Sequence, residues 1–529
     1  MRSSQVGGAL VIVLAAVSID GPRARSQGGS GSGSEVVEAG SDDDDPGSGS
    51  NNGSGSTLVA PGDPTARQAW LRDRFAALVT ARPTLARARL GFHVVDLSTG
   101  KELLSKEGDR GLNLASNTKL LTAVAALSGL GGGFRWRTGV FCAPPDADGK
   151  VAGDLYIRGR GDPVLSVDGL RALAKEVAAR GVREVEGKLV VDTSYFDNIT
   201  EPPHFDEQPK ERAAFRAPIA SFAVNRSAYE VVVMAEPAGA ASITIEPPLP
   251  EYLKLTKTEV TSTREGRTRL RLDAKVKPNA IELDVTGTIR GGGGTWDLRR
   301  RVDDPARFAA EVFRRALSDY GIRLRTRTIA YGPVPMIGVK QIAVHDSPTL
   351  ADVMRSMNKH SDNNVAEAVL KTLGAELKPV PGNGATWAQG ITAMRTQLGK
   401  LGVIGTFRVE NGSGLYASTE VSPKQLVGLL VAAHKDYRIG PDLVASLPVG
   451  GSDGTLARRW HNKPARGRVR AKTGTLDKVS SLAGYIGVDG GHLLAFAILA
   501  NDIPAGQRAV VRAMADEMVD TLAAYLDAR

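Results

Sequence analysis

The stretch Leu112–Leu127, which reads LNLASNTKLLTAVAAL, carries the pattern from which the fold and the chemistry can both be predicted. Its apolar residues predict a helix that Ser116 opens and that runs through Lys119 toward Leu127. Side chains three positions apart share one face of a helix, so the hydroxyl and the amine should be neighbours. A serine at a helix start also meets the positive end of the helix dipole, which favours a developing alkoxide. We therefore predict Ser116 as a nucleophile and Lys119 as its proton acceptor, provided that the amine is neutral. Burial and a second nearby cation would both lower its pKa.

The Ser-x-x-Lys pattern alone is a weak signal, because the chain contains it in other places. Ser98–Lys101 lies in a predicted hairpin turn, and Ser356–Lys359 ends a predicted helix. Among these three matches, Ser116 stands at a helix start among apolar residues. Further motifs are needed before the pattern indicates catalysis.

Two later triplets supply the missing chemistry. Ser361-Asp362-Asn363 lies between two predicted helices, and its hydroxyl and amide could relay a proton and hold a peptide bond; alone, it fits a helix N-cap equally well. Lys472-Thr473-Gly474-Thr475 lies on a predicted strand and offers a second cation, hydroxyls for a carboxylate and a glycine that permits close approach; alone, it could be a surface strand ending in a turn. Together with Ser116–Lys119, the set is the signature of β-lactamases and penicillin-binding proteins.

The two ends of the folded chain should complete one antiparallel sheet. Two alternating strands at the front surround a turn at Ser98–Lys101, and the last two strands at the back flank Asp489-Gly490-Gly491, a strong hairpin signal. We predict strands at 90–95, 103–105, 469–473, 480–488 and 492–500, a first helix at 66–80 and a closing helix at 508–526. The middle of the chain mixes helical and alternating segments, so we predict an insertion of one or two mixed α/β modules.

The 529 residues exceed what one hydrophobic core usually holds, so several domains are expected. Arg2 and the apolar run from Ala9 to Val17 fit a signal peptide, since the run is too short to span a bilayer. We therefore predict export, to a periplasmic or extracellular location, without a stable transmembrane segment. The predicted division is a signal peptide at 1–26, a disordered Gly/Ser-rich linker at 27–63, a catalytic domain at 64–127 and 344–529, and inserted modules at 128–343.

With these motifs the chain resembles the penicillin-binding proteins of the D-alanyl-D-alanine carboxypeptidase/endopeptidase type, which carry a large insertion after the nucleophile helix. The resemblance runs from about Pro64 to the C-terminus, and the wide separation of Ser116 from Ser361 is typical of that subfamily and too large for an ordinary β-lactamase. It implies an α/β (α+β) fold, in which a five-stranded antiparallel sheet flanked by helices forms the serine β-lactamase/DD-peptidase-like domain. One departure is Asn411, where an aspartate is also expected in such proteins.

The resemblance also implies a role for each motif residue. Ser116 would attack the penultimate D-alanine of a peptidoglycan stem peptide, and Lys119 would accept its proton. Backbone N–H groups of Ser116 and Thr475 would form an oxyanion hole, and β-lactam antibiotics would be trapped as covalent inhibitors. The implied catalytic residues are Ser116, Lys119, Ser361, Asn363 and Lys472, and the implied substrate-binding residues are Thr473, Gly474 and Thr475.

Other features of the chain point to no further chemistry. Its one cysteine, Cys142, can form no intramolecular disulfide, and we predict that it is buried. The seven histidines lack metal-ligand spacing, and basic residues do not interleave with aromatic ones, so we predict no metal, no cofactor and no nucleic acid partner. The oligomeric state stays open. Two alternatives for the function remain: a β-lactamase, and a non-catalytic β-lactam- or wall-binding sensor.

Overall fold

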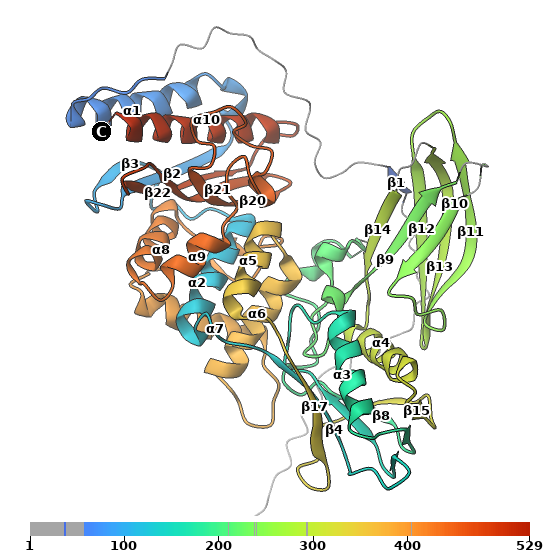
Figure 1. Cartoon of the computed structure of the whole chain (residues 1–529). Coiled ribbons are helices and arrows are strands. Elements are labelled where there is room, and N and C mark those ends of the chain that lie inside the picture. The colour runs from blue at the N-terminus through green and yellow to red at the C-terminus, as the bar shows by residue number, and fades with distance from the viewer. Residues whose placement is uncertain are drawn as a thin grey trace, which may run out of the picture.

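The computed structural model describes residues 36–38 and 58–528, apart from positions 210, 237, 238, 240, 292–294 and 404 (Figure 1). The predicted signal peptide and all but the last residues of the predicted linker therefore lie outside the described residues, apart from the short strand β1 (Val36–Glu38). Within the described part, no helix combines the length and apolar character needed to cross a membrane.

One five-stranded antiparallel sheet joins the front and the back of the chain, as predicted. Its order is β20-β21-β22-β2-β3. The predicted strands are confirmed, each with small shifts of its ends: β2 (Arg89–Asp96), β3 (Glu102–Lys106), β20 (Val469–Leu476), β21 (Val479–Gly487) and β22 (Leu493–Asn501).

The two faces of this sheet are covered by different helices, as Figure 1 shows. Along β22, Phe496 and Ile498 belong to the core shared with α1 (Pro64–Thr80) and α10 (Arg508–Asp527). The alternate residues Ala497 and Leu499 belong to the core shared with α8 (Pro423–Lys435). The period of two along the strand thus places a separate apolar layer on each side of the sheet.

A helical layer lies beneath the second face of the sheet and carries the nucleophile segment. Its main helices pack around α2, whose residues from Leu120 to Leu127 are all buried. They are α2 (Thr118–Leu130), α5 (Leu350–His360), α6 (Asn363–Leu377), α7 (Trp387–Lys400), α8 and α9 (Gly440–Ser446).

The middle of the chain forms mixed α/β structure with a hydrophobic core of its own, which contains the buried Cys142. Two paired strands lead into it and out of it: β4 (Arg137–Cys142) follows α2, and β17 (Lys340–Asp346) precedes α5. One part of it contains α3 (Val167–Ala179), α4 (Pro305–Asp319) and the five-stranded sheet β16-β8-β6-β4-β17. Besides β4 and β17, the strands of the middle part are β5 (Lys150–Val151), β6 (Leu155–Arg158), β7 (Glu184–Val185), β8 (Leu189–Asp192), β9 (Ala228–Ala235), β10 (Ala241–Glu246), β11 (Leu253–Thr263), β12 (Arg269–Lys277), β13 (Ala280–Arg290), β14 (Thr295–Arg301), β15 (Arg323–Leu324) and β16 (Ile329–Tyr331).

The local structure at Ser116 differs from the prediction. Ser116 does not open the α-helix but lies in a single 3₁₀ turn, Ala115–Asn117, directly before α2. Ala115 adopts a left-handed backbone, with φ of 46°. The tighter turn still leads into a helix N-terminus, so the serine keeps the favourable end of the dipole.

Candidate active site

Ser116 and Lys119 are in direct contact. The Lys119 Nζ lies 3.0 Å from the Ser116 Oγ and also donates to the carbonyl oxygen of Ser413 at 2.9 Å. The lysine side chain is fully buried. Burial is the main cause that lowers the pKa of Lys119 to about 7, against smaller opposing effects of the carboxylates of Glu367 and Asp362. A substantial fraction of the amine is therefore neutral at physiological pH and can accept the serine proton.

The nucleophile turn is fixed to the edge of the sheet by buried hydrogen bonds. Asn117 Nδ2 donates to Ser481 Oγ at 2.7 Å, and Ser481 Oγ donates to the carbonyl of Leu114 at 2.7 Å. Gly474 lies against the same turn: a Cβ there would stand 2.6 Å from the Leu114 oxygen and 3.0 Å from the Ser116 nitrogen. Only glycine lets β20 approach the nucleophile this closely.

A second serine and lysine pair faces the first. Ser361 ends α5 in a left-handed conformation with φ of 57°, and Asp362 caps the start of α6 through the nitrogen of Val365. The Lys472 Nζ donates to Ser361 Oγ at 2.8 Å and to the carbonyl of Thr473 at 2.7 Å. Burial, and then the charge of Lys119, hold the pKa of Lys472 well below its ordinary value.

Asn363 lies two residues after Ser361 and contacts the lysine of the first pair. Its Oδ1 accepts from the Lys119 Nζ at 2.6 Å, and its Nδ2 donates to the carbonyl of Phe215, which belongs to the middle part of the chain. The side chains of Ser116, Lys119, Asn363, Ser361 and Lys472 are thus brought together from three separate segments.

The predicted substrate-binding residues follow Lys472 along β20. Thr473 Oγ1 donates to Thr455 Oγ1 at 2.8 Å, and Thr455 belongs to the short Gly454–Leu456 turn. Thr475 pairs with Ser480 on the neighbouring strand, and its side chain is exposed. The two hydroxyl-bearing strand residues stand on either side of Gly474, beside the nucleophile.

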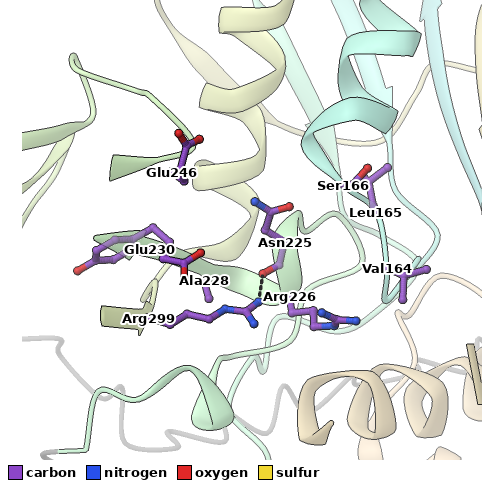
Figure 2. A pocket seen from close by; sticks show the side chains of 10 residues that line it. Val164, Leu165, Ser166, Asn225, Arg226, Ala228, Glu230, Glu246 and Arg299 are labelled. Carbon is purple, nitrogen blue, oxygen red and sulfur yellow. Dashed lines mark hydrogen bonds between the residues drawn. The ribbon is translucent and has the colours of Figure 1, made fainter. Parts of the chain in front are cut away.

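Arg226 supports the second motif, and no local pattern predicts this role. The loop Asn225–Ser227 has three successive left-handed residues, with φ between 51° and 56°. Arg226 is one of the residues that line a cavity of about 190 Å³, shown in Figure 2. In the same loop, the carbonyl of Asn225 accepts a hydrogen bond from Arg299 at 3.2 Å. From this loop the Arg226 guanidinium reaches Asp362 at 2.7 Å and Ser356 at 3.1 Å. The strained loop thus holds Asp362, the residue between Ser361 and Asn363. This contact depends on the tertiary fold.

Asn411 stands where an aspartate is also expected, and it uses both ends of its amide. Its Oδ1 accepts from the nitrogen of Gly414 and from Ser418, and its Nδ2 donates to the carbonyl of Leu415 at 3.0 Å. An ionised aspartate could make the first two bonds but could not donate the third. The buried amide therefore closes the loop that presents the Ser413 carbonyl to Lys119.

Among the residues that the structure describes, no three or more histidine, cysteine, aspartate or glutamate side chains are grouped so as to hold a metal ion. The reactive groups gathered at the site are two hydroxyls and two amines, all supplied by the chain itself.

The buried lysine beside a serine, under one end of a five-stranded antiparallel sheet, defines a serine hydrolase of the penicillin-binding type. A family model described as the D-Ala-D-Ala carboxypeptidase 3 (S13) family matches residues 71–525, and the chain belongs to this family. A D-alanyl-D-alanine carboxypeptidase from Actinomadura sp. (strain R39) is 35% identical over 452 residues, which cover 82% of each chain.

Solved structures agree on the fold. Penicillin binding protein 4 from Haemophilus influenzae has a TM-score of 0.69 at 23% identity, over 85% of this chain and 98% of that one. The same protein complexed with a novel β-lactam has a TM-score of 0.66 at 24% identity, with the same coverage. The predicted family, the predicted fold class and the prediction of a serine-type D-Ala-D-Ala carboxypeptidase are confirmed.

Proposed function

We propose that the protein releases the terminal D-alanine from peptidoglycan stem peptides through an acyl-enzyme at Ser116. The observation that carries this assignment is the pair of serine–lysine hydrogen bonds, Ser116 with Lys119 and Ser361 with Lys472. Asn363, two residues after Ser361, accepts a further bond from Lys119. Family membership supports the reaction class, and the geometry supports the role of each residue.

Acylation begins when the Ser116 oxygen attacks the carbonyl carbon of the penultimate D-alanine. Its proton passes to the neutral Lys119 amine, 3.0 Å away. The carbonyl oxygen becomes an oxyanion, which the backbone N–H groups of Ser116 and Thr475 stabilise; each donor in such a site typically contributes about 2.7–4 kcal/mol. Gly474 keeps β20 close enough for the two donors to point at one oxygen.

Collapse of the tetrahedral intermediate breaks the C–N bond and requires a proton on the leaving amine. Ser361 is the proposed donor, because its hydroxyl contacts Lys472 and can be reprotonated from that side. Asn363 holds the acyl-side amide of the substrate. Water then attacks the Ser116 ester, which restores the serine hydroxyl and yields the shortened peptide acid.

The exposed carboxylate of the departing D-alanine is the feature that Thr473 and Thr475 recognise. Thr473 is already oriented by its hydrogen bond to Thr455, so its hydroxyl is held at the strand edge. This recognition distinguishes a chain end from an internal peptide bond and favours carboxypeptidase action; cleavage of cross-links between stem peptides would use the same acylation step.

β-Lactams carry a strained amide in the place of the scissile bond, so Ser116 should open the ring and remain acylated. The complex of the Haemophilus influenzae protein with a β-lactam supports this expectation. A β-lactamase would instead hydrolyse the ester quickly, and a sensor would form it without releasing D-alanine from peptides.

The experiment measures both reactions on one preparation. A fluorescent penicillin should label the wild-type protein and not Ser116→Ala, and the wild type should release D-alanine from a pentapeptide. Labelling without D-alanine release would indicate a sensor, and rapid turnover of penicillin would indicate a β-lactamase. Absence of both reactions in the folded wild type would overturn the proposal.

The proposed location is outside the cytoplasm. A peptidoglycan enzyme acts outside the cytoplasmic membrane, which agrees with the signal-like segment at 1–26 and with periplasmic or extracellular export. We retain the division into a catalytic domain at 64–127 and 344–529 and inserted modules at 128–343. The separate core of the middle part supports these boundaries.

A further inference from the structure

A buried carboxylate stands behind the catalytic lysine, and none of the motifs includes it. Glu367 lies on the first turns of α6, with 2% of its surface exposed. It accepts from Trp387 Nε1 at 2.8 Å, from the nitrogen of Gly412 at 2.9 Å and from the nitrogen of Ser413 at 2.8 Å. Two of its three donors therefore belong to the backbone of the loop that faces Lys119.

We propose that Glu367 is a positioning residue for the reaction, which orders the Gly412–Ser413 backbone so that the Ser413 carbonyl holds the Lys119 amine against Ser116. This role rests on the proposed function, since it acts through Lys119. Glu367 makes no contact with the reacting atoms and is not itself catalytic.

The geometry forms a short, continuous path. The Glu367 carboxylate binds the nitrogen of Ser413, and the carbonyl of the same residue accepts from the Lys119 Nζ at 2.9 Å. Gly412 packs against α6 so closely that a Cβ would lie 2.6 Å from the carbonyl of Ala366. The Gly412–Ser413 loop therefore packs in direct contact with α6, and the Glu367 carboxylate holds it in that position.

A carboxylate is suited to this position because all three of its contacts are donors. Glu367 Oε2 accepts from two groups and Oε1 from one, so each oxygen must be an acceptor. Glutamine would turn an N–H₂ group toward at least one of these N–H groups, and the resulting unpaired, buried donors would push the loop away.

The same carboxylate affects the charge of the lysine. Groups that face Lys119 include the carboxylates of Glu367 and Asp362, which raise its pKa, and the amine of Lys472 on β20. Asp362 is paired with Arg226, whereas the Glu367 contacts are all uncharged donors. Removing the charge of Glu367 should therefore let the pKa of Lys119 fall further below about 7.

The test compares Glu367→Gln with the wild type by the second-order rate of penicillin acylation between pH 5 and pH 9. We expect acylation at pH 8 to slow by about 10- to 100-fold, because the Lys119 amine is less well placed. The acidic limb of the profile should move to lower pH by about half a unit or more. Glu367→Asp, which keeps the charge, should leave the limb in place.

Glu311→Gln is the matched control. Glu311 is equally buried, but it lies on α4 in the middle of the chain, where it pairs with Arg307 and Arg314. We expect it to lower the thermal midpoint without changing the acylation rate or its pH profile. A Glu367→Gln protein that acylates at the wild-type rate, or more slowly but with an unmoved acidic limb, would overturn the proposal.

Trp387→Phe keeps the test decisive if Glu367→Gln does not fold. It removes one donor and leaves the carboxylate charged, so we expect a loss of about 2- to 10-fold in acylation with the limb unmoved. An unchanged rate in Trp387→Phe would count against the positioning role. A wild-type protein that fails to acylate would refute the proposed function instead, so the two failures are distinguishable.

Discussion

Two segments of the molecule share the pattern Ser-x-x-Lys and lie on or beside helices, yet they have different surroundings. Lys119 is fully buried and contacts a hydroxyl, an amide oxygen and a backbone carbonyl, and no carboxylate of the described residues forms an ion pair with it. Lys359 is paired with Asp453 at 2.5 Å, and Ser356 accepts a hydrogen bond from Arg226. The comparison teaches that spacing brings a hydroxyl and an amine to one helix face, whereas a reactive amine also requires burial and the absence of a paired carboxylate.

The largest expected difference concerns the two serines. Ser116→Ala removes the atom that forms the acyl-enzyme, so D-alanine release and penicillin labelling should fall by a factor of about 10⁴ or more. Ser356→Ala removes one neutral hydrogen bond to Arg226 and should retain activity within about threefold. Both variants should be compared by initial rates on a pentapeptide. Loss of labelling in Ser356→Ala with Ser116→Ala still labelled would reverse the assignment.

Substitution of Lys119 should likewise slow acylation much more than substitution of Lys359. Lys119→Met leaves the Ser116 hydroxyl without its base and should reduce acylation by about 10³-fold, while Lys359→Met removes a partly exposed ion pair and should change it little. Wild-type kcat/KM should rise with pH through about 7, where the Lys119 amine becomes neutral. A profile that is flat from pH 5 to pH 9 would exclude Lys119 as the base.

Much of this fold could be predicted from sequence because its signals are local. Alternation along 480–500 and the turn at Asp489–Gly491 predicted β21 and β22 to within one residue at each end. The predicted closing helix at 508–526 likewise matches α10 to within one residue. The 3₁₀ turn at Ser116 was missed, because it depends on Ala115 being held in a left-handed conformation by its tertiary surroundings.

The reactive residues of the site could be predicted from the sequence, but the residues that position them could not. The eight motif residues could be named because each has a reactive or hydrogen-bonding group in a known pattern. Arg226, Glu367 and the Ser413 carbonyl act through contacts between segments far apart in the chain, and nothing in their local sequence distinguishes them. Such supporting contacts are set by tertiary packing, which a single sequence does not encode in any local pattern.

A glycine pair extends the comparison to the backbone around the true nucleophile. Gly474→Ala would place a methyl group within 3.0 Å of the Ser116 nitrogen and closer still to the carbonyl of Leu114, so β20 must move away. We expect acylation to fall by about 10²-fold through loss of the oxyanion hole. Gly428→Ala lies on α8 with open space around it and should retain activity and add up to about 1 kcal/mol of stability. Equal acylation rates in the two variants would contradict the proposed oxyanion site.

The smallest expected effect concerns stability and its sign with pH. The pKa of Lys119 is about 7 in the folded protein against 10.5 for an ordinary lysine, so between these values the unfolded chain binds more protons. The folded state therefore loses stability as pH falls from about 10.5 to about 7, and no more below that. Methionine does not titrate, so the free energy of unfolding of Lys119→Met, relative to wild type, should increase by about 2 kcal/mol as the pH falls from 9 to 7.

Urea unfolding of Lys119→Met, Lys359→Met and the wild type at the two pH values measures this difference. The Lys359 variant removes a similar length of side chain from an ion pair that is partly open to solvent, so it should change the free energy of unfolding by only about 0–1 kcal/mol. If the relative stability of Lys119→Met is the same at both pH values, the amine is charged in the folded protein and cannot be the base at neutral pH. The pH-dependent gap thus tests, without substrate, whether burial has made one of two similar lysines available for chemistry.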